Sequence, residues 1–446
     1  MPDLPAPYLF AMLRLMDLPT RTVPSFLAVM LHVLLLLLAF AILPATPARA
    51  ATITVSGTAE QTGKLSVSFQ NLRGDASTAA QEFISILRND LSLSGYFRPT
   101  DQTQAAVTLD GMVRGTPSGI AVSLRASWLA DTRTNQWQQQ ADFRQLRDAA
   151  HSLADTLIRE ITGNPSMASS KILFIGRRGG SSEVYICDAD GAGIRQLTSD
   201  RKPCLSPNWI PNRNAFTYTS WISGVPAAYT VNINDNRRSR LSAKPGMNQG
   251  AVVSPHGDRA AIILSYAGTV DLYLVNARDG RLLDRLTRQG GNEASPSWSP
   301  DGRSIVYVTD TGKVPHCVIQ SLSAGSQPKR LVYANSIREN VAPEWGNNGK
   351  IAFCGRTAGR YCIYTIDAKT DPRLAVPTLV SPNDGCDYED PSWAPDGRHI
   401  VCTRTANYRK SLVVLDTLGD PPRPLFNVPG EWYLPSWSQN NVSLMP

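Results

Sequence analysis

The chain has 446 residues, of which 42% are apolar and 18% charged, and it contains 32 glycines and 32 prolines. The apolar fraction excludes a disordered chain, and so much glycine and proline argues against a coiled coil or a helical solenoid. The net charge of +7 comes from scattered Lys and Arg residues that form no basic block, so nucleic-acid binding is not expected.

The first fifty residues have the pattern of a signal peptide. An almost unbroken apolar run covers residues 26–43, two arginines precede it, and an A-x-A motif that ends at Ala50 follows it. We therefore expect residues 1–50 to be removed by cleavage between Ala50 and Ala51, which yields an exported protein. An uncleaved anchor is the alternative, because the run is just long enough to span a bilayer.

All seven cysteines lie in the second half of the chain. Export permits disulfides, and Cys354 and Cys362 flank a short turn where a bridge is conceivable. The alternative is that most cysteines are small buried residues, since several replace Tyr or Ile of neighbouring repeats. No C-x-x-C spacing of a zinc site occurs, and we expect the protein to have no cofactor.

Residues 51–163 combine strand and helix patterns, which predicts a small α/β domain. Apolar residues alternate over residues 64–70, 106–113 and 120–128. Helical periodicity covers residues 77–93 and 142–161, and Gly163 has the position of a helix stop. Two helices on one face of a small sheet would give a compact domain.

From residue 171 onward the chain repeats every 44 to 48 residues. The clearest copies of the repeat are Pro296–Gly302 and Pro391–Gly397, which read P-S-W-[S/A]-P-D-G. The six anchor positions of the repeat are Trp209, Val253, Trp298, Trp345, Trp393 and Trp437.

Each anchor is followed by a pair of predicted strands, with two exceptions. The first pair, within residues 171–188, has no anchor before it, and the last anchor, Trp437, has no pair after it. A ring explains this offset, since the last strand can complete the first blade. We therefore predict a two-domain α+β protein in which the small α/β domain precedes a six-bladed β-propeller. The propeller covers residues 164–446 and is closed by the C-terminal strand.

Simple geometry assigns the anchors structural roles. Each Trp is expected to fill the wedge between neighbouring blades, and Asp301 and Asp396 to form turns rather than bind metal. Known catalytic patterns, such as G-x-S-x-G and H-E-x-x-H, do not occur, and His256 takes a turn position expected to be solvated. An active site within the propeller channel stays open as an alternative.

Two motifs of the first domain carry a family resemblance. Residues 90–99 (DLSLSGYFRP) resemble the D-L-x-x-S-G-x-F-x-P segment of the TolB family, the periplasmic component of the Tol-Pal system. Ala150-His151, Asp155 and Thr162-Gly163 match that family's A-H-x-x-x-D-x₆-T-G spacing. The resemblance covers essentially the whole mature chain, and we interpret His151 as a helix-packing residue without a chemical role.

The resemblance implies a non-enzymatic, monomeric periplasmic protein that reaches the membrane only through its partners. It would bind the peptidoglycan-associated lipoprotein Pal at the mouth of the propeller channel. Its N-terminal segment would bind the inner-membrane Tol complex through TolA. Such a scaffold supports outer-membrane integrity and envelope constriction at cell division.

The loops before the strands at residues 248 and 293 correspond to family positions that contact Pal, and we extend this contact to the other loops by ring geometry. The N-terminal segment is the one that the resemblance assigns to TolA. The loops that enter the innermost strands combine amides, acids and aromatic rings that look exposed. The residues expected to contact Pal are Asn248, Gln249, Asn292, Glu293, Ser295, Glu339, Asn340, Tyr388, Glu389, Trp432 and Tyr433. The residues expected to contact TolA are Thr52, Ile53, Thr54 and Val55.

The sequence departs from the family in several places, and two other functions stay open. Val253 replaces an anchoring Trp, the stretch between Asp101 and Gly111 is short, and the cysteines are more numerous than expected. The main alternative is an exported propeller hydrolase that cleaves lactones or glycans, which acids inside the channel would favour. The propeller of a peptidase is disfavoured, because no hydrolase domain follows the sixth anchor.

Overall fold

The computed structural model describes residues 63–100, 104–288, 290–333, 337, 339–374 and 376–439. The predicted signal peptide, its cleavage site at Ala50 and Ala51, and the predicted TolA segment of residues 52–55 lie outside these ranges. Within them, we find no helix with the length and apolar character needed to cross a membrane.

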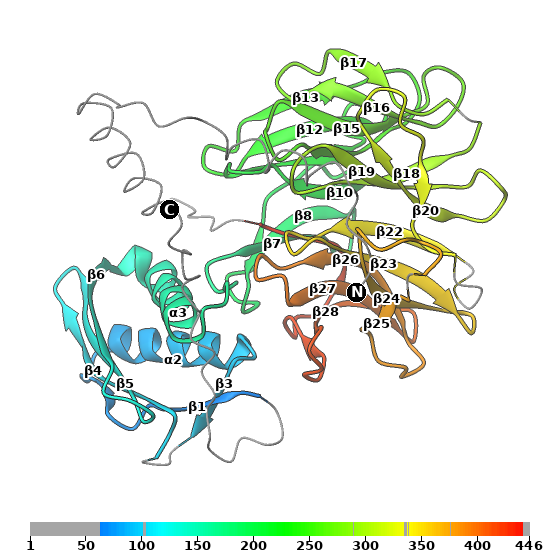
Figure 1. Ribbon diagram of the computed structural model, residues 1–446. Helices are drawn as coiled ribbons and strands as arrows, with labels where there is room; N and C mark the ends of the chain where they lie inside the picture. The colour runs from blue at the N-terminus through cyan, green and yellow to red at the C-terminus, as the bar shows by residue number, and fades with distance from the viewer. Residues whose placement is uncertain are drawn as a thin grey trace, which may run out of the picture. The chain divides into compact units, whose positions relative to one another are not determined.

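The first domain is a curved sheet with two helices on one side of it (Figure 1). The helices are α2 (Thr78–Leu93) and α3 (Leu146–Thr162), and a short 3₁₀ turn η1 (Phe143–Gln145) precedes α3. The strand order is β3-β1-β4-β5-β6, and β2 also pairs with β4. The strands are β1 (Leu65–Ser68), β2 (Leu72–Gly74), β3 (Phe97–Thr100), β4 (Val107–Thr116), β5 (Gly119–Trp128) and β6 (Thr134–Asp142).

Both predicted helices are confirmed. The side chain of Ser77 caps α2 by accepting a hydrogen bond from the Ala80 N–H, and the apolar face of α2 is buried in the core of the domain. Gly163 ends α3 with a φ of 73°, the left-handed conformation that favours glycine.

Three strands of this sheet escaped prediction, and the predicted start of α3 was wrong. The strand β6 continues to Asp142, so α3 begins at Leu146. Every residue of β6 is exposed or half-buried, and therefore its sequence TNQWQQQAD lacks the alternation of apolar residues that marks a half-buried strand. The strands β2 and β3 have only three and four residues, too few for a periodic pattern.

The second domain has six four-stranded sheets arranged as the blades of a propeller. Each blade begins with its innermost strand and ends with its outermost one. The first five blades in chain order are β10 (Cys204–Trp209), β11 (Ala215–Ser220), β12 (Ala227–Asn232), β13 (Arg238–Ser242); β14 (Asn248–Val253), β15 (Arg259–Leu264), β16 (Asp271–Asn276), β17 (Leu282–Arg285); β18 (Glu293–Trp298), β19 (Ser304–Thr309), β20 (His316–Ser321), β21 (Lys329–Arg330); β22 (Asn340–Trp345), β23 (Lys350–Thr357), β24 (Arg360–Asp367), β25 (Thr378–Leu379); and β26 (Asp387–Trp393), β27 (His399–Ala406), β28 (Arg409–Asp416), β29 (Arg423–Pro424).

The sixth blade joins the two ends of the propeller sequence, as predicted. Its strand order is β30-β7-β8-β9, with β30 (Glu431–Trp437), β7 (Lys171–Arg177), β8 (Glu183–Asp188) and β9 (Arg195–Gln196). The indole N–H of Trp437 also donates to Ser170 Oγ at 2.7 Å, beside the linker from the first domain. The last strand therefore closes the ring and removes the open edge of β7.

The repeated tryptophans lie between blades, as their spacing predicts. The Trp298 indole donates to the carbonyl of Val252 in the preceding blade at 2.9 Å, and Trp209 donates in the same way to Ser436 at 2.9 Å. Each bond ties a buried side chain to the innermost strand of a neighbouring blade. Val253 takes the anchor position of its own blade and is also buried, so the apolar wedge is kept without the hydrogen bond.

The structure favours the interpretation of the cysteines as buried core residues. All seven are free, and all except Cys386 are buried. Cys362 pairs with Gly355, the residue after Cys354, so the two cysteines of the hairpin point to opposite faces. Their side chains accordingly lie in two different apolar clusters, and a disulfide between them is not formed.

We expect Trp298→Ala to lower the free energy of unfolding by about 3–5 kcal/mol, because it leaves a cavity between blades and an unpaired carbonyl. Urea unfolding followed by circular dichroism measures this loss. Tyr408→Ala serves as the control, since Tyr408 is 97% exposed and its removal should change stability little. Equal losses in both variants would contradict the assigned role of the tryptophan.

Candidate functional site

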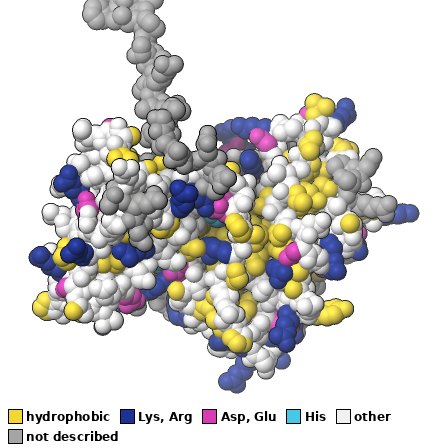
Figure 2. Space-filling model, turned by 90° about the horizontal axis from the view of Figure 1, so that it is seen from below, with side chains coloured by type: hydrophobic (Ala, Val, Ile, Leu, Met, Phe, Trp, Pro, Cys, Tyr) yellow, Lys and Arg dark blue, Asp and Glu magenta, His cyan; other side chains and the backbone are white. Residues whose placement is uncertain are grey.

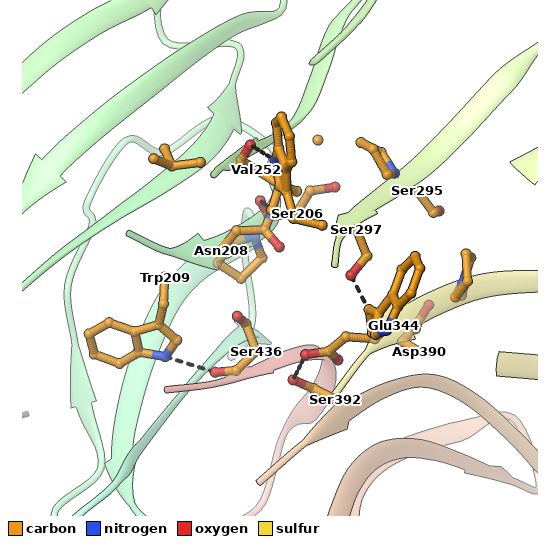
Figure 3. Close-up of a pocket in the computed structure, with 18 of the residues that line it drawn as sticks. Ser206, Asn208, Trp209, Val252, Ser295, Ser297, Glu344, Asp390, Ser392 and Ser436 are labelled. Carbon is orange, nitrogen blue, oxygen red and sulfur yellow. Dashed lines mark hydrogen bonds between the residues drawn. The ribbon is translucent and has the colours of Figure 1, made fainter. Parts of the chain in front are cut away.

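The six innermost strands surround a cavity of about 630 Å³ along the propeller axis. In each P-x-W repeat, the residue between Pro and Trp lines this cavity (Figure 3). These residues are Asn208, Ser297, Glu344, Ser392 and Ser436, and Val252 takes the same place in the blade without a Trp. Sequence reasoning missed them, although their fixed place in the repeat is a signal that could have found them.

A β-bulge in each innermost strand shapes the cavity wall. The pairing between each innermost strand and the second strand of its blade shifts register once. A residue at each shift has a φ between 48° and 64°. These residues are Ser206, Gly250, Ser295, Ala342, Asp390 and Leu434. Because each bulge inserts one residue, the strands curve and turn small or polar groups toward the cavity.

The cavity wall is acidic. Glu344 accepts a hydrogen bond from Ser392 Oγ at 3.1 Å, and burial raises its pKa to about 8. Asp390, on the neighbouring strand, accepts from Thr403 Oγ1 at 3.3 Å, and burial raises its pKa to about 6. Among the described lining residues there is no Lys, Arg or His. The described wall therefore offers carboxyl, hydroxyl and amide groups for hydrogen bonding.

Five of the eleven residues predicted to contact Pal are buried in the blades: Asn248, Glu293, Asn340, Tyr388 and Trp432. The side-chain oxygen of Asn248 accepts hydrogen bonds from Ser242 Oγ at 2.8 Å and from the Lys244 N–H at 2.9 Å. Glu293 accepts from two threonine hydroxyls in the same way. The expected exposure of the Tyr388 and Trp432 rings is therefore wrong, because these positions anchor the loops within the fold.

The other six predicted residues reach the surface or the cavity: Gln249, Asn292, Ser295, Glu339, Glu389 and Tyr433. Gln249 and Ser295 line the cavity, and Asn292 donates to Asp310 at 2.8 Å on the exposed surface. Glu339 accepts from the Tyr361 hydroxyl at 2.8 Å. These residues lie around one end of the channel, and their contact with Pal stays a prediction.

Exposed apolar side chains gather at the same end of the channel, which we call the mouth face. The start of each innermost strand pairs with the end of the next strand, as Asn248 does with Leu264. The hairpin turns that follow these second strands therefore share the end where the innermost strands begin. Exposed apolar residues on these turns and loops are Ile222, Val225, Met247, Tyr266, Val314, Tyr333 and Tyr408, and fewer, Leu374, Val376 and Leu418, are exposed on the turns at the opposite end.

The two family motifs of the first domain meet in three dimensions. His151, on α3, is fully buried, and its Nδ1 lies 2.6 Å from a carboxylate oxygen of Asp90 on α2. On the other side of the ring, Nε2 lies 3.5 Å from Asp188 Oδ2 of the propeller. Asp155, one turn further along α3, accepts from the N–H groups of Ala168 and Ser169 in the linker.

This cluster of His151 with Asp188 and Asp190 also has the spacing of metal ligands. Its carboxylates already have cationic partners, because Arg147 binds Asp188 at 2.9 Å and Asp190 at 2.8 Å. Lys171 binds Asp188 at 2.8 Å as well. A metal ion would have to displace these side chains, so we interpret the cluster as an ionic connection between the domains, in which His151 joins α3 to Asp90 of α2 and to Asp188 of the propeller.

A second contact between the domains involves the other half of the first motif. The Arg398 guanidinium lies 4.7 Å from the centre of the Tyr96 ring and forms a 2.5 Å ion pair with Asp416. Gly95 has a φ of 73°, and a Cβ at this position would overlap the Arg398 side chain. The S-G pair of the motif therefore allows the propeller arginine to approach the first domain closely.

We expect the stability of the chain to fall as the pH rises from about 6.5 to 9, because of His151. Burial alone would lower the pKa of His151, but hydrogen bonds to Asp188 and Asp90 outweigh it and raise the pKa to about 9. Its stabilising charge is thus fully present below pH 6.5 and is lost as the pH rises through 9. The expected loss is on the order of 2–3 kcal/mol.

Urea unfolding at pH 6.5 and pH 9.5 measures this effect in wild-type protein, His151→Gln and His256→Gln. His256 is exposed and supplies the matched control. His151→Gln should remove most of the difference between the two pH values, whereas His256→Gln should keep it. If His151→Gln retained the full difference, other groups would have to cause it.

Comparison with known proteins agrees with this architecture. The family described as TolB beta propeller domain matches residues 158–441. The Tol-Pal system protein TolB of Bordetella pertussis is 28% identical over 383 residues, which are 81% of this chain and 85% of that protein. A protein TolB homolog of Chlorobium luteolum is 34% identical over 186 residues, 41% of each chain.

The solved structure of TolB from Acinetobacter baumannii covers 84% of this chain, and 96% of that structure is matched. The TM-score is 0.74 at 21% identity, so this similarity shows the fold. Since the family match extends over more than half of the sequence, the chain belongs to the TolB β-propeller family.

Proposed function

We propose that this protein is a non-enzymatic periplasmic scaffold of the Tol-Pal system that binds Pal on the mouth face. The observation that carries the proposal is the concentration of exposed apolar and amide side chains around one end of the channel. Protein interfaces combine a few aromatic anchors with a polar rim, and the mouth face has both. Binding there would support outer-membrane integrity and envelope constriction during division.

Two rings on the mouth face lie against lysine side chains. Lys244 Nζ lies 5.8 Å from the centre of the Tyr266 ring, and Lys410 Nζ lies 5.2 Å from that of Tyr433. A ring held in this way loses little further freedom when a partner binds, which lowers the entropic cost of binding. On the face drawn in Figure 2, Lys and Arg side chains are scattered and form no single patch, which disfavours nucleic acid as the partner.

The proposed contact with TolA involves Thr52, Ile53, Thr54 and Val55, which lie outside the described residues. Their support is the sequence, in which β-branched residues alternate with smaller ones as in a strand that can be added to another sheet. Export to the periplasm likewise depends on the predicted leader and its cleavage after Ala50. A monomer that is peripheral to the membrane fits both contacts.

An exported hydrolase is the second candidate, and one observation favours it. Glu344 and Asp390 place two acids with raised pKa values inside the channel, and enzymes often use such groups. Both acids accept hydrogen bonds from hydroxyls of the channel wall, which also suits a purely structural role. Hydrolysis of lactone or glycan substrates that disappears in Glu344→Gln would support the hydrolase.

Calorimetric titration with the soluble domain of Pal from the same organism tests the proposal. We expect saturable binding that Tyr266→Ala weakens about 5- to 30-fold, because the substitution removes an aromatic anchor of the mouth face. The ring is 38% exposed, so the variant should fold normally.

Leu418→Ala is the matched control. Leu418 is 72% exposed and lies in the turn between the third and fourth strands of its blade, at the opposite end of the channel. Its replacement should leave the affinity unchanged. No binding of folded Pal to the wild-type protein would refute the proposal and favour the hydrolase.

A further inference from the structure

We propose that Tyr408, at the tip of the hairpin between β27 and β28, anchors Pal on the mouth face. Its ring enters an apolar pocket of that partner, and Arg409 beside it contacts a carboxylate at the rim of the pocket. The inference rests on the proposed function and deepens it, since it names the residues of this chain that contribute most to the same contact.

The backbone at the tip of this hairpin is left-handed. Ala406 pairs with Arg409, so the turn between the two strands consists of Asn407 and Tyr408 alone. Their φ angles are 49° and 62°, as in a type I′ turn. This turn favours asparagine at its first position and glycine at its second, because a bulky side chain is strained in the left-handed conformation. Tyr408 therefore occupies the position that suits glycine.

The corresponding turn of each of the other five blades contains a glycine with positive φ. These glycines are Gly179, Gly224, Gly268, Gly312 and Gly359, with φ between 77° and 103°. The blade before that of Tyr408 gives the most direct comparison, because its turn also has two residues, Ala358 and Gly359, between paired strand ends. Glycine relieves the strain in that turn, whereas the turn of Tyr408 keeps it.

The Tyr408 ring does not stabilise the fold in return. The residue is 97% exposed, and the described contacts include no hydrogen bond, ring contact or cation contact of its side chain. Among the described non-glycine residues with positive φ, it is the only aromatic one. Strain at a side chain that packs against nothing in its own chain points to a contact with another molecule.

The hairpin presents the ring on a rigid support. β27 and β28 pair over all eight residues of each strand without a bulge, whereas the first three blades have loops at this end, residues 221–226, 265–270 and 310–315. Thr405 pairs with Asp387, the first residue of the innermost strand, so the turn extends beyond that strand at the mouth. A ring on such a support loses little freedom when a partner binds, which lowers the entropic cost of binding.

The residues that follow the ring indicate the chemistry of the partner surface. Arg409 is exposed, and Lys410 lies against the Tyr433 ring at 5.2 Å from its centre. The described ion pairs include neither Arg409 nor Lys410. The tip thus combines an aromatic ring with positive charge that a carboxylate of a partner can pair with. Tyrosine and arginine are also the residue types that most often dominate the energy of protein interfaces.

Calorimetric titration of the exported and processed chain with the soluble domain of Pal tests the anchor. Tyr408→Ala and Tyr408→Gly should each weaken binding at least about tenfold, because both remove the ring. Tyr408→Phe keeps the ring and should lose less than about threefold. Thermal unfolding separates the first two variants. Tyr408→Gly should raise the midpoint by about 2–4 °C, since glycine relieves the strain, whereas Tyr408→Ala should leave the midpoint unchanged.

Arg409→Gln tests the charge by itself and should reduce the dependence of the affinity on salt. Leu418→Ala, at the opposite end of the channel, is the control and should bind Pal like the wild type. Wild-type affinity in Tyr408→Ala, with binding weakened in Tyr266→Ala, would overturn the anchor and leave the proposed Pal contact intact. No binding of Pal to the wild-type chain would overturn both. An unchanged salt dependence in Arg409→Gln would refute the role of Arg409.

Discussion

The pairing of β30 with β7 is the interaction on which the arrangement of the propeller depends. It joins residues more than 250 positions apart and converts a row of six sheets into a ring without open inner edges. Because the ring is closed, the six innermost strands must converge on one axis. The channel, its acidic wall and the circle of loops at the mouth all follow from that convergence.

The same strand connects the mouth to the first domain. Its first residues, Glu431 and Trp432, lie at the mouth, and its last residue, Trp437, donates a hydrogen bond to Ser170 in the linker. Beside the linker, the buried pair of His151 and Asp90 reaches Asp188 of the propeller. The motifs that identify the family in the first domain are thus the residues that attach this domain to the ring.

Polar groups in this protein have two uses that the sequence does not distinguish. At the first position of the innermost strands, Asn248 and Glu293 face into the blade and hold the preceding loop. Their chain neighbours, Gln249 after Asn248 and Asn292 before Glu293, face the cavity or solvent. The direction of a side chain alternates along a strand, so a shift of one residue decides between a buried and an accessible group.

The sequence by itself determined the two-domain order, the six repeats, the closure of the ring, both helices and the anchoring tryptophans. These features depend on periodicity and on turn residues, which are local properties of the chain. It did not reveal β6, because the core-facing side of this edge strand is only half-buried and carries Gln139 between Trp137 and Ala141, so the apolar alternation is incomplete. Only the tertiary structure decided which loop residues are buried and brought Asp90, His151 and Asp188 together. Contacts between distant segments depend on how the blades and domains pack, and no local pattern encodes them.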